Sequence, residues 1–185
     1  MKELSLNILD ITENSVKAGA SLTRILIEET ADSLTISIKD DGCGMSEEVV
    51  KRVIDPFYTT RTTRSVGLGI PLFKLAAEMT GGSFEISSKE KDKYPDDHGT
   101  LTKAQFIKNH IDFTPLGDVA STLTTLIQGH PDTDFYFCHT FGDKSVTLDT
   151  RELREILGND VPLGEYEVIK WIEGYLQEQY SIFEN

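Results

Sequence analysis

The sequence predicts an α/β fold, because stretches with the period of an amphipathic helix alternate along its 185 residues with stretches that have the period of a strand. The composition is that of a folded domain, with 38% hydrophobic and 26% charged residues, 14 Gly and 6 Pro. This length is enough for one domain with a real core, or for one domain and a small appendage.

The first predicted element is a helix over residues 3–18, in which apolar side chains recur among polar ones and small residues follow the last turn. Two strands come next, over 24–28 and 34–38, joined by a turn near 31–33. The second strand is apolar at every other position, which is typical of a strand with one buried face.

A short helix is predicted over 46–54, because Ser46 is a good N-cap and acidic residues follow it. Residues 55–67 have no periodicity and form a loop, and a loop of this length in a small domain is usually functional. A helix over 68–80 then ends at a pair of glycines. Two further strands lie on either side of a charged loop, over 83–88 and 100–107.

The last part of the chain predicts a second set of elements. Thr150 is the expected N-cap of its middle helix. The predicted elements are a helix over 116–128, a hairpin of strands 134–141 and 144–149, a helix from Thr150 to Leu157, and an amphipathic helix over 165–180.

The distribution of charge divides the chain in two. The net charge is -13, of which residues 1–111 carry -3 and residues 112–185 carry -10. The shift falls at a stretch of turn residues, so we expect a domain over 1–111 and a small acidic α/β extension over 112–185. The alternative is one continuous domain with an acidic face. We expect the extension to pack against the first part, beside strand 100–107, because about 75 residues can only marginally support a core of their own.

The composition also excludes several classes of protein. Only two cysteines are present, so there is no disulfide framework and no zinc site with four cysteine ligands. No apolar run approaches a membrane span, and the first residues do not resemble a secretory signal, which makes a cytoplasmic location the default. The acidic excess argues against nucleic acid as the ligand.

Four motifs carry the chemistry. One follows a predicted strand directly: Asp40-Asp41-Gly42-Cys43-Gly44-Met45. A carboxylate at a strand end can accept a hydrogen bond from an exocyclic amine, and the spaced glycines let the backbone approach a flat ligand. A tight turn explains the same pattern equally well.

A second motif lies on the first helix, where Asp10 and Asn14 share one face and Lys17 lies near it. The amide oxygen of Asn14 suits Mg²⁺, and Lys17 suits a phosphate. Alone, such a polar stripe is most often a solvated helix face.

The other two motifs belong to loop 55–67 and the helix that follows it. The loop offers hydroxyl donors and two cations, and Ser65-Val66-Gly67-Leu68-Gly69-Ile70 opens the helix with free N–H groups that suit phosphate oxygens. A flexible solvated loop is the alternative.

The order of these motifs resembles the N, G1, F and G2 boxes of the gyrase, heat-shock chaperone, histidine kinase and mismatch-repair ATPase superfamily. All four fall within residues 10–70, with Asp55-Pro56-Phe57-Tyr58-Thr59-Thr60-Arg61 as the F box. The resemblance covers about residues 1–108. It implies a Bergerat-type two-layer α/β sandwich, with helices on one face of a mixed sheet and ATP between the helices and a mobile lid.

The resemblance also implies roles for individual residues. Asn14 would coordinate Mg²⁺, and Asp40 would accept from the adenine amino group. Asp10, four residues before Asn14, occupies the position where the hydrolysing branches have a Glu as general base. The other residues implied to contact the nucleotide or form its lid are Lys17, Gly42, Gly44, Met45, Phe57, Thr59, Thr60, Arg61, Arg64, Gly67, Leu68 and Gly69.

Two departures from the family pattern bear on the reaction. The kinase-type G2 box usually begins with a Gly where Ser65 stands here, and the general base would be an Asp rather than a Glu. The lysine at position 17, three residues after Asn14, is similar to the kinase pattern, whereas the sequence Glu13-Asn14-Ser15 looks like that of the mismatch-repair branch. All four histidines follow the ATP motifs, so we expect the protein to lack the phosphoacceptor segment that a sensor kinase places before them.

Three functions therefore stay open. The first is an Mg·ATP-binding protein that hydrolyses ATP slowly or switches conformation with it. The second is the catalytic half of a split histidine kinase that acts on a partner in trans. The third is a non-enzymatic ATP-sensing module. In each case the acidic extension could bind a protein partner or mediate homo-oligomer formation, and fold completion is the alternative role.

Overall fold

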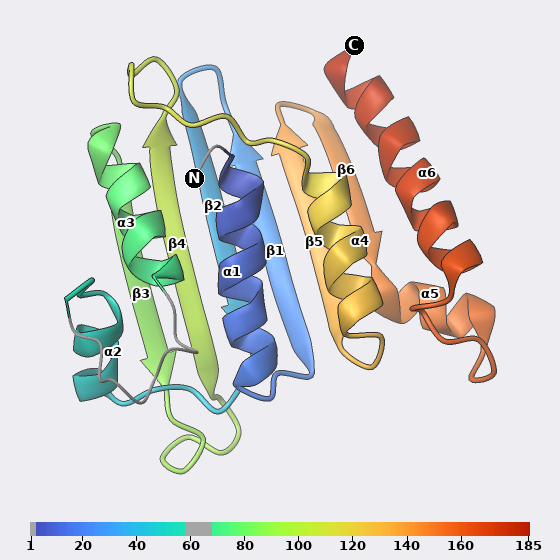
Figure 1. Ribbon diagram of the computed structural model, residues 1–185, viewed down its shortest axis with the longest axis horizontal. Helices are drawn as coiled ribbons and strands as arrows, with labels where there is room; N and C mark the ends of the chain where they lie inside the picture. The colour runs from blue at the N-terminus through green and yellow to red at the C-terminus, as the bar shows by residue number, and fades with distance from the viewer. Residues whose placement is uncertain (1–2, 58–67) are drawn as a thin grey trace.

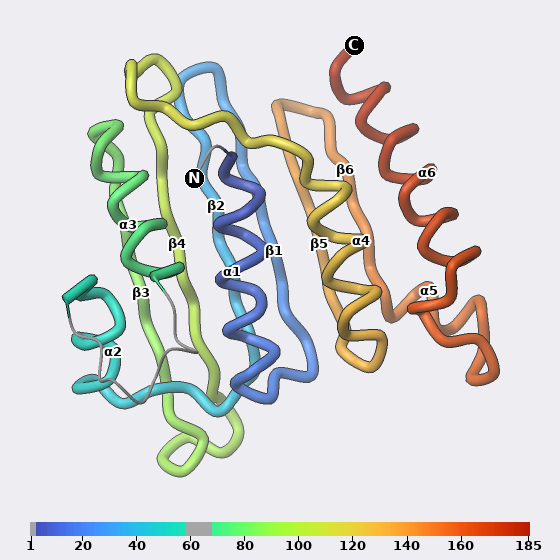
Figure 2. Tube along the Cα trace, in the orientation of Figure 1, coloured from blue at the N-terminus to red at the C-terminus, as the bar shows by residue number. Residues whose placement is uncertain are grey.

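Twelve helices and strands appear in the computed structural model, which describes residues 3–57 and 68–185 (Figures 1 and 2). The helices are α1 (Leu4–Lys17), α2 (Glu47–Val53), α3 (Gly69–Met79), α4 (Val119–Gly129), α5 (Thr150–Leu157) and α6 (Tyr166–Glu184). The strands are β1 (Leu22–Glu29), β2 (Ser33–Asp40), β3 (Ser83–Lys89), β4 (Gly99–Ile107), β5 (Asp134–Phe141) and β6 (Lys144–Asp149).

All six strands belong to one mixed sheet, in the order β3-β4-β2-β1-β5-β6. Four of the five pairings are antiparallel, and β1 and β5 are parallel, with Ile25 opposite Phe137. Strand β1 therefore joins the first four strands to the hairpin of β5 and β6.

Helices α1, α3 and α4 lie on one face of this sheet (Figure 1). Strand β1 shows why: its odd-numbered residues Thr23, Ile25 and Ile27 are buried on that side, whereas Arg24 and Glu28 are exposed on the other. The buried side chains of both predicted parts form a single hydrophobic cluster, in which Leu4 and Ile8 of α1 belong with Leu123 of α4. This is the two-layer α/β sandwich that the sequence predicts.

The predicted elements are confirmed, with bounds that shift by a few residues. Helix α2 begins after Ser46, whose hydroxyl accepts from the N–H of Val49 at 3.2 Å. The hairpin of β5 and β6 has the predicted bounds. The predicted cap of α5 is wrong by one residue, because Asp149 accepts from the N–H of Arg151 and Thr150 is already helical. The Thr150 hydroxyl instead donates to Asp134 at 2.8 Å.

The predicted position of the extension is also wrong. Residues 112–185 pack against the first part, as expected, but β5 pairs with β1 and not with strand 100–107. The position beside β4 is taken by β3 on one side and by β2 on the other. The edge of β1 that β2 leaves open is the one that β5 fills.

Over the part of the chain that the structure describes, no helix has both the length and the apolar character needed to cross a membrane.

Candidate functional site

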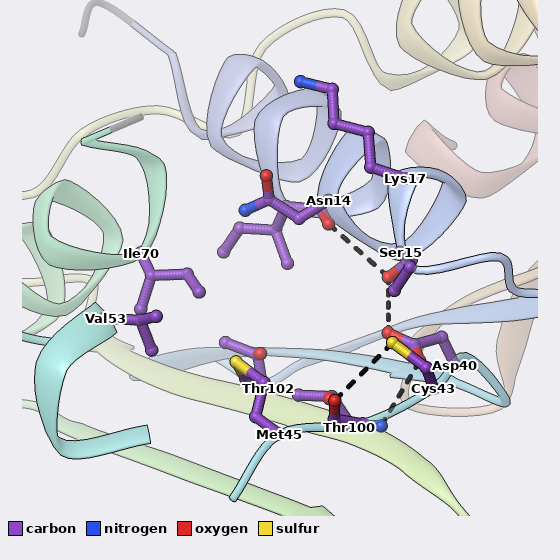
Figure 3. A pocket seen from close by; sticks show the side chains of 13 residues that line it. Asn14, Ser15, Lys17, Asp40, Cys43, Met45, Val53, Ile70, Thr100 and Thr102 are labelled. Atoms are coloured by element: carbon purple, nitrogen blue, oxygen red, sulfur yellow. Dashed lines mark hydrogen bonds between the residues drawn. The ribbon is translucent and has the colours of Figure 1, made fainter. Parts of the chain in front are cut away.

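A cavity of about 250 Å³ opens between α1 and the ends of β2 and β4 (Figure 3). Its walls combine a few polar groups with apolar side chains, as small-molecule sites usually do. The lining residues are Ile11, Asn14, Ser15, Lys17, Ala18, Asp40, Cys43, Gly44, Met45, Val53, Ile70, Thr100 and Thr102. The cavity therefore contains the predicted Asn14, Lys17, Asp40, Gly44 and Met45.

Asp40 is the most constrained polar group of the cavity. It is the last residue of β2, and only 8% of it is exposed. Its Oδ2 accepts from the Ser15 hydroxyl at 2.7 Å, and its Oδ1 accepts from the N–H groups of Gly42 at 2.9 Å and Thr100 at 3.3 Å. Three elements thus hold the carboxylate in place. Because a carboxylate has about four lone-pair sites, one remains on Oδ2 for a ligand.

The turn after Asp40 needs its glycines. Gly44 has φ +71°, and a Cβ there would lie 1.9 Å from the carbonyl oxygen of Lys89. A Cβ on Gly42 would lie about 3 Å from Ala18 and from the Asp40 carboxylate. The turn is thereby pressed against α1 and the loop after β3. His98 also contacts this turn through a hydrogen bond, with its Nδ1 2.6 Å from the carbonyl oxygen of Gly42.

Asn14 is partly buried on α1, and Figure 3 shows its amide extending into the space above Thr102 and Met45. Lys17 lines the cavity with its stem, and its amine points away from Asp40 in the same view. The positive charge therefore lies on the Asn14 side of the cavity, at a distance from the carboxylate.

Asp10 lies one helical turn before Asn14, next to the start of α3. A Cβ on Gly69, the first residue of α3, would lie 3.2 Å from the Cβ of Asp10. Partial burial raises the pKa of Asp10, the nearby Glu13 raises it further, and Lys17 opposes both. A raised pKa suits a carboxylate that accepts a proton, but Asp10 is not one of the residues that line the cavity.

Other predicted residues lie outside the cavity or outside the described residues. Phe57 is 93% exposed and does not line the cavity, and Leu68 is also exposed at the start of α3. Thr59, Thr60, Arg61, Arg64 and Gly67 lie outside the described residues. Within 3–57 and 68–185, no group of three or more His, Cys, Asp or Glu side chains could hold a metal ion.

Several lining residues were not predicted, although the sequence carries a signal for most of them. Ile11 and Ala18 lie three residues before and four residues after Asn14, and Ser15 follows Ile11 by four residues, so the helical period brings them to one side of α1 and its C-cap. Thr100 and Thr102 alternate on β4 and so face the same side of the sheet. Cys43 lies between the two glycines of the turn. Val53 and Ile70 come from α2 and α3, whose positions over the cavity no local pattern reveals.

Comparison with known proteins identifies the family. The sequence profile described as "Histidine kinase-, DNA gyrase B-, and HSP90-like ATPase" matches residues 2–115. The chain belongs to this family. Among curated members, Sporulation kinase E of Bacillus subtilis is 32% identical over 90 residues, which are 49% of this chain and 12% of that protein. The chain thus matches only a small part of this longer kinase.

Two solved structures are similar to this chain in fold. The MutL ATPase domain of Aquifex aeolicus, complexed with ADP, superposes with a TM-score of 0.52 at 12% identity, over 85% of this chain and 69% of that one. The N-terminal domain of a DNA repair protein gives 0.54 at 14% identity, over 86% and 58%. Both superpositions cover more of the chain than residues 2–115, so the likeness of fold extends into the acidic extension.

Proposed function

We propose that the protein binds Mg·ATP in the cavity beside Asp40, and that it hydrolyses the nucleotide slowly or changes conformation with it. The family supports nucleotide binding, and one observation carries the assignment to this cavity. It is the Asp40 carboxylate, which Ser15, Gly42 and Thr100 hold with one lone-pair site unused.

The cavity fits the base of the nucleotide. Its volume of about 250 Å³ is below the ~300–1,000 Å³ of sites that hold a whole drug-sized ligand, so it suits a base with the remaining groups outside. Ile11, Met45, Val53 and Ile70 supply apolar walls for a flat ring. The free lone pair of Asp40 can accept from an exocyclic amine such as that of adenine, and it repels the carbonyl that guanine has at the same position.

Asn14 fits the magnesium ion. Mg²⁺ is usually held by one or two protein oxygens together with waters and substrate phosphates, so a single amide oxygen on α1 is enough. When bound, the ion would neutralise phosphate charge. The chain's own contribution would be to orient the phosphates through Asn14 and Lys17. Asp10 would accept the proton of the attacking water at its carboxylate.

A second candidate is the catalytic half of a split histidine kinase that acts on a partner. The observation that favours it is the similarity to Sporulation kinase E, which is 32% identical over 90 residues of this chain. A non-enzymatic ATP sensor is the third candidate. It would use the same cavity without turnover.

Calorimetry with Mg·ATP tests the cavity assignment. The wild type is expected to bind, and Asn14→Ala is expected to bind at least ~10-fold more weakly, because the metal loses its protein oxygen. Asn109→Ala is the matched control, since Asn109 is exposed and hydrogen-bonds Asp32 in a distant turn. Equal affinity in Asn14→Ala and the control would refute the assignment.

Incubation with γ-labelled ATP separates the three functions. Label released as phosphate supports hydrolysis, and label transferred to an added protein supports the kinase. Binding in calorimetry, with all label retained in ATP, supports the sensor.

A further inference from the structure

Helix α6 carries aromatic side chains that the fold buries only in part. Its buried side packs on the molecule through Val168, Ile172 and Leu176. Trp171, Tyr175, Glu178 and Ile182 follow one another at spacings of four, three and four residues, which places them in a row along another side of the helix. We call Glu167 and these four residues the α6 stripe.

The stripe lies on the flank of α6 that faces away from α4. Gln177, Tyr180 and Glu184 line the groove that α6 forms with the start of α4. At 100° per residue, these positions are about 120° to 180° from Trp171 around the helix axis. Figure 1 shows α6 at the outer end of the layer of helices, with α4 on its inner side.

Two apolar members of the stripe are open to solvent, whereas Tyr175 is partly buried against the core. Trp171 is 55% exposed and Ile182 is 64% exposed. The rings of Trp171 and Tyr175 stack, with centroids 5.3 Å apart and 12° between their planes. Large aromatic surface left in water, such as that of Trp171, is typical of binding sites.

The charge around the stripe indicates what binds there. Glu167 and Glu178 are exposed and belong to the stripe itself. Residues 112–185 carry a net charge of -10. Their four basic side chains already have partners within the chain. Arg151 and Arg154 pair with Asp149 and Asp134, Lys144 donates to a carbonyl oxygen, and Lys170 lies 5.0 Å from the ring centroid of Tyr166.

We propose that the α6 stripe docks a basic segment of another protein. An arginine of that segment lies over the Trp171 ring, and its basic neighbours pair with Glu167 and Glu178. Lys170 over Tyr166 shows that this helix already pairs a cation with an aromatic ring. The charge excludes a nucleic acid, and it opposes a second copy of this chain, since each copy carries -13.

Trp171 is the only tryptophan of the chain, so its fluorescence reports on the stripe alone. The probes are nona-arginine and nona-lysine, titrated into the full chain without nucleotide. We expect both to bind and nona-arginine to bind tighter, because a guanidinium stacks on an aromatic face better than an ammonium does. Nona-arginine should also protect Trp171 from acrylamide quenching. Trp171 that stays equally accessible at saturation would overturn the proposal.

A matched pair of charge variants separates local docking from general attraction. In Glu167→Gln/Glu178→Gln, binding of labelled nona-arginine by anisotropy should weaken ~3–10-fold. Glu47→Gln/Glu85→Gln removes the same charge from exposed positions on α2 and β3 and should leave binding within about twofold. Equal weakening in the two variants would mean that only net charge matters, and the proposal would fail.

Trp171→Leu keeps an apolar side chain and removes the aromatic face. It should abolish the preference for nona-arginine over nona-lysine, while circular dichroism remains that of the wild type. Sedimentation supplies the last check. A wild-type dimer that Trp171→Leu converts to a monomer would assign the stripe to a second copy and overturn the basic-partner proposal.

Discussion

At the scale of single residues, the site depends on two neighbouring carboxylates with different environments. Asp40 is buried and bound by Ser15 and two backbone N–H groups. Asp41 is exposed and caps the start of β1, where its Oδ1 accepts from the N–H groups of Ser21 and Leu22. The same side chain thus lines the cavity at one position and binds the backbone before β1 at the next, and this allows a controlled comparison.

Asp40→Asn should damage the recognition of the base. The amide can turn an N–H towards the adenine amino group, so a charge-assisted hydrogen bond worth about 1.5–3 kcal/mol is lost. Competition between ATP and GTP measures the effect, and Asp41→Asn is the control at an exposed position. A variant at Asp40 that still prefers ATP strongly would show that Asp40 does not read the base.

Asp10→Asn should slow hydrolysis by roughly 10²–10⁴-fold and leave ATP affinity nearly unchanged, since a general base acts on the water rather than on binding. The same substitution lowers the rate of hydrolysis but is expected to raise the stability of the fold. Burial and Glu13 raise the pKa of Asp10 above its ordinary 3.8. The protonated form therefore stabilises the fold at low pH, and this stabilisation is lost as the pH rises through the raised pKa.

Urea unfolding between about pH 3 and pH 7 tests this sign. Asp10→Asn should gain stability over the wild type as the pH rises, and Asp92→Asn, at an exposed loop position, should run parallel to the wild type. A variant at Asp10 that loses stability towards neutral pH would contradict it.

The residues that could be predicted from the sequence are those whose motif fixes both the residue type and the backbone. Asp40 ends a strand and Gly44 follows at set spacing, and both line the cavity, whereas Gly42 lies in the same turn and donates to Asp40. Ser15 was missed as a site residue because its role depends on a hydroxyl that meets Asp40 from another element, 25 residues away. His139, on β5, is enclosed by the fold. It is 2% exposed and lies between Glu29 and Tyr180, and burial lowers its pKa.

At the scale of elements, the turn after β2 is the part that backbone geometry constrains most. It lies between α1 and the loop after β3, with the Cys43 N–H bonded to Ala18 and its carbonyl to the N–H of Lys91. The turn could be predicted because glycine is required where φ is positive. The packing of α2 over the cavity could not, since a seven-residue helix without fully buried residues has no strong periodicity.

Gly44→Ala should destabilise the protein by more than ~1 kcal/mol and weaken ATP binding, because the new methyl group would meet the carbonyl of Lys89 in a backbone conformation that alanine disfavours. Gly142→Ala is the matched control, since Gly142 has φ +59° but open space around it. Urea unfolding and calorimetry measure both variants. Equal losses of stability in the two variants would mean that the positive φ alone, and not the contact with Lys89, accounts for the destabilisation.

At the scale of the whole molecule, the acidic extension completes both the sheet and the core. Strand β5 lies along the full length of β1, and α4 packs against α1. His130 also lies 2.9 Å from Glu13, the residue before Asn14. The sequence predicted that the extension packs, because its core residues are too few to fold alone. It could not predict the edge, because strand pairing between distant segments leaves no local signal.

Deletion of residues 112–185 should leave a 1–111 fragment that does not fold stably, since it uncovers one edge of β1 and apolar residues of α1 such as Leu4 and Ile8. Circular dichroism and calorimetry check this. A soluble, folded fragment with full ATP affinity would show instead that the extension is an independent module.

The parallel pairing of β1 with β5 also affects how the chain acquires its structure during synthesis. Ile25 lies opposite Phe137, so the central strand β1 pairs with a strand that is synthesised more than a hundred residues later. Until the ribosome has released β5, one backbone edge of β1 is open in the growing chain. This edge can pair with other nascent chains, and the strand carries the apolar residues Ile25 and Ile27. Such distant pairing also slows the search for the native state. Faster translation or higher expression temperature should therefore send more of this protein into inclusion bodies than its final stability would suggest.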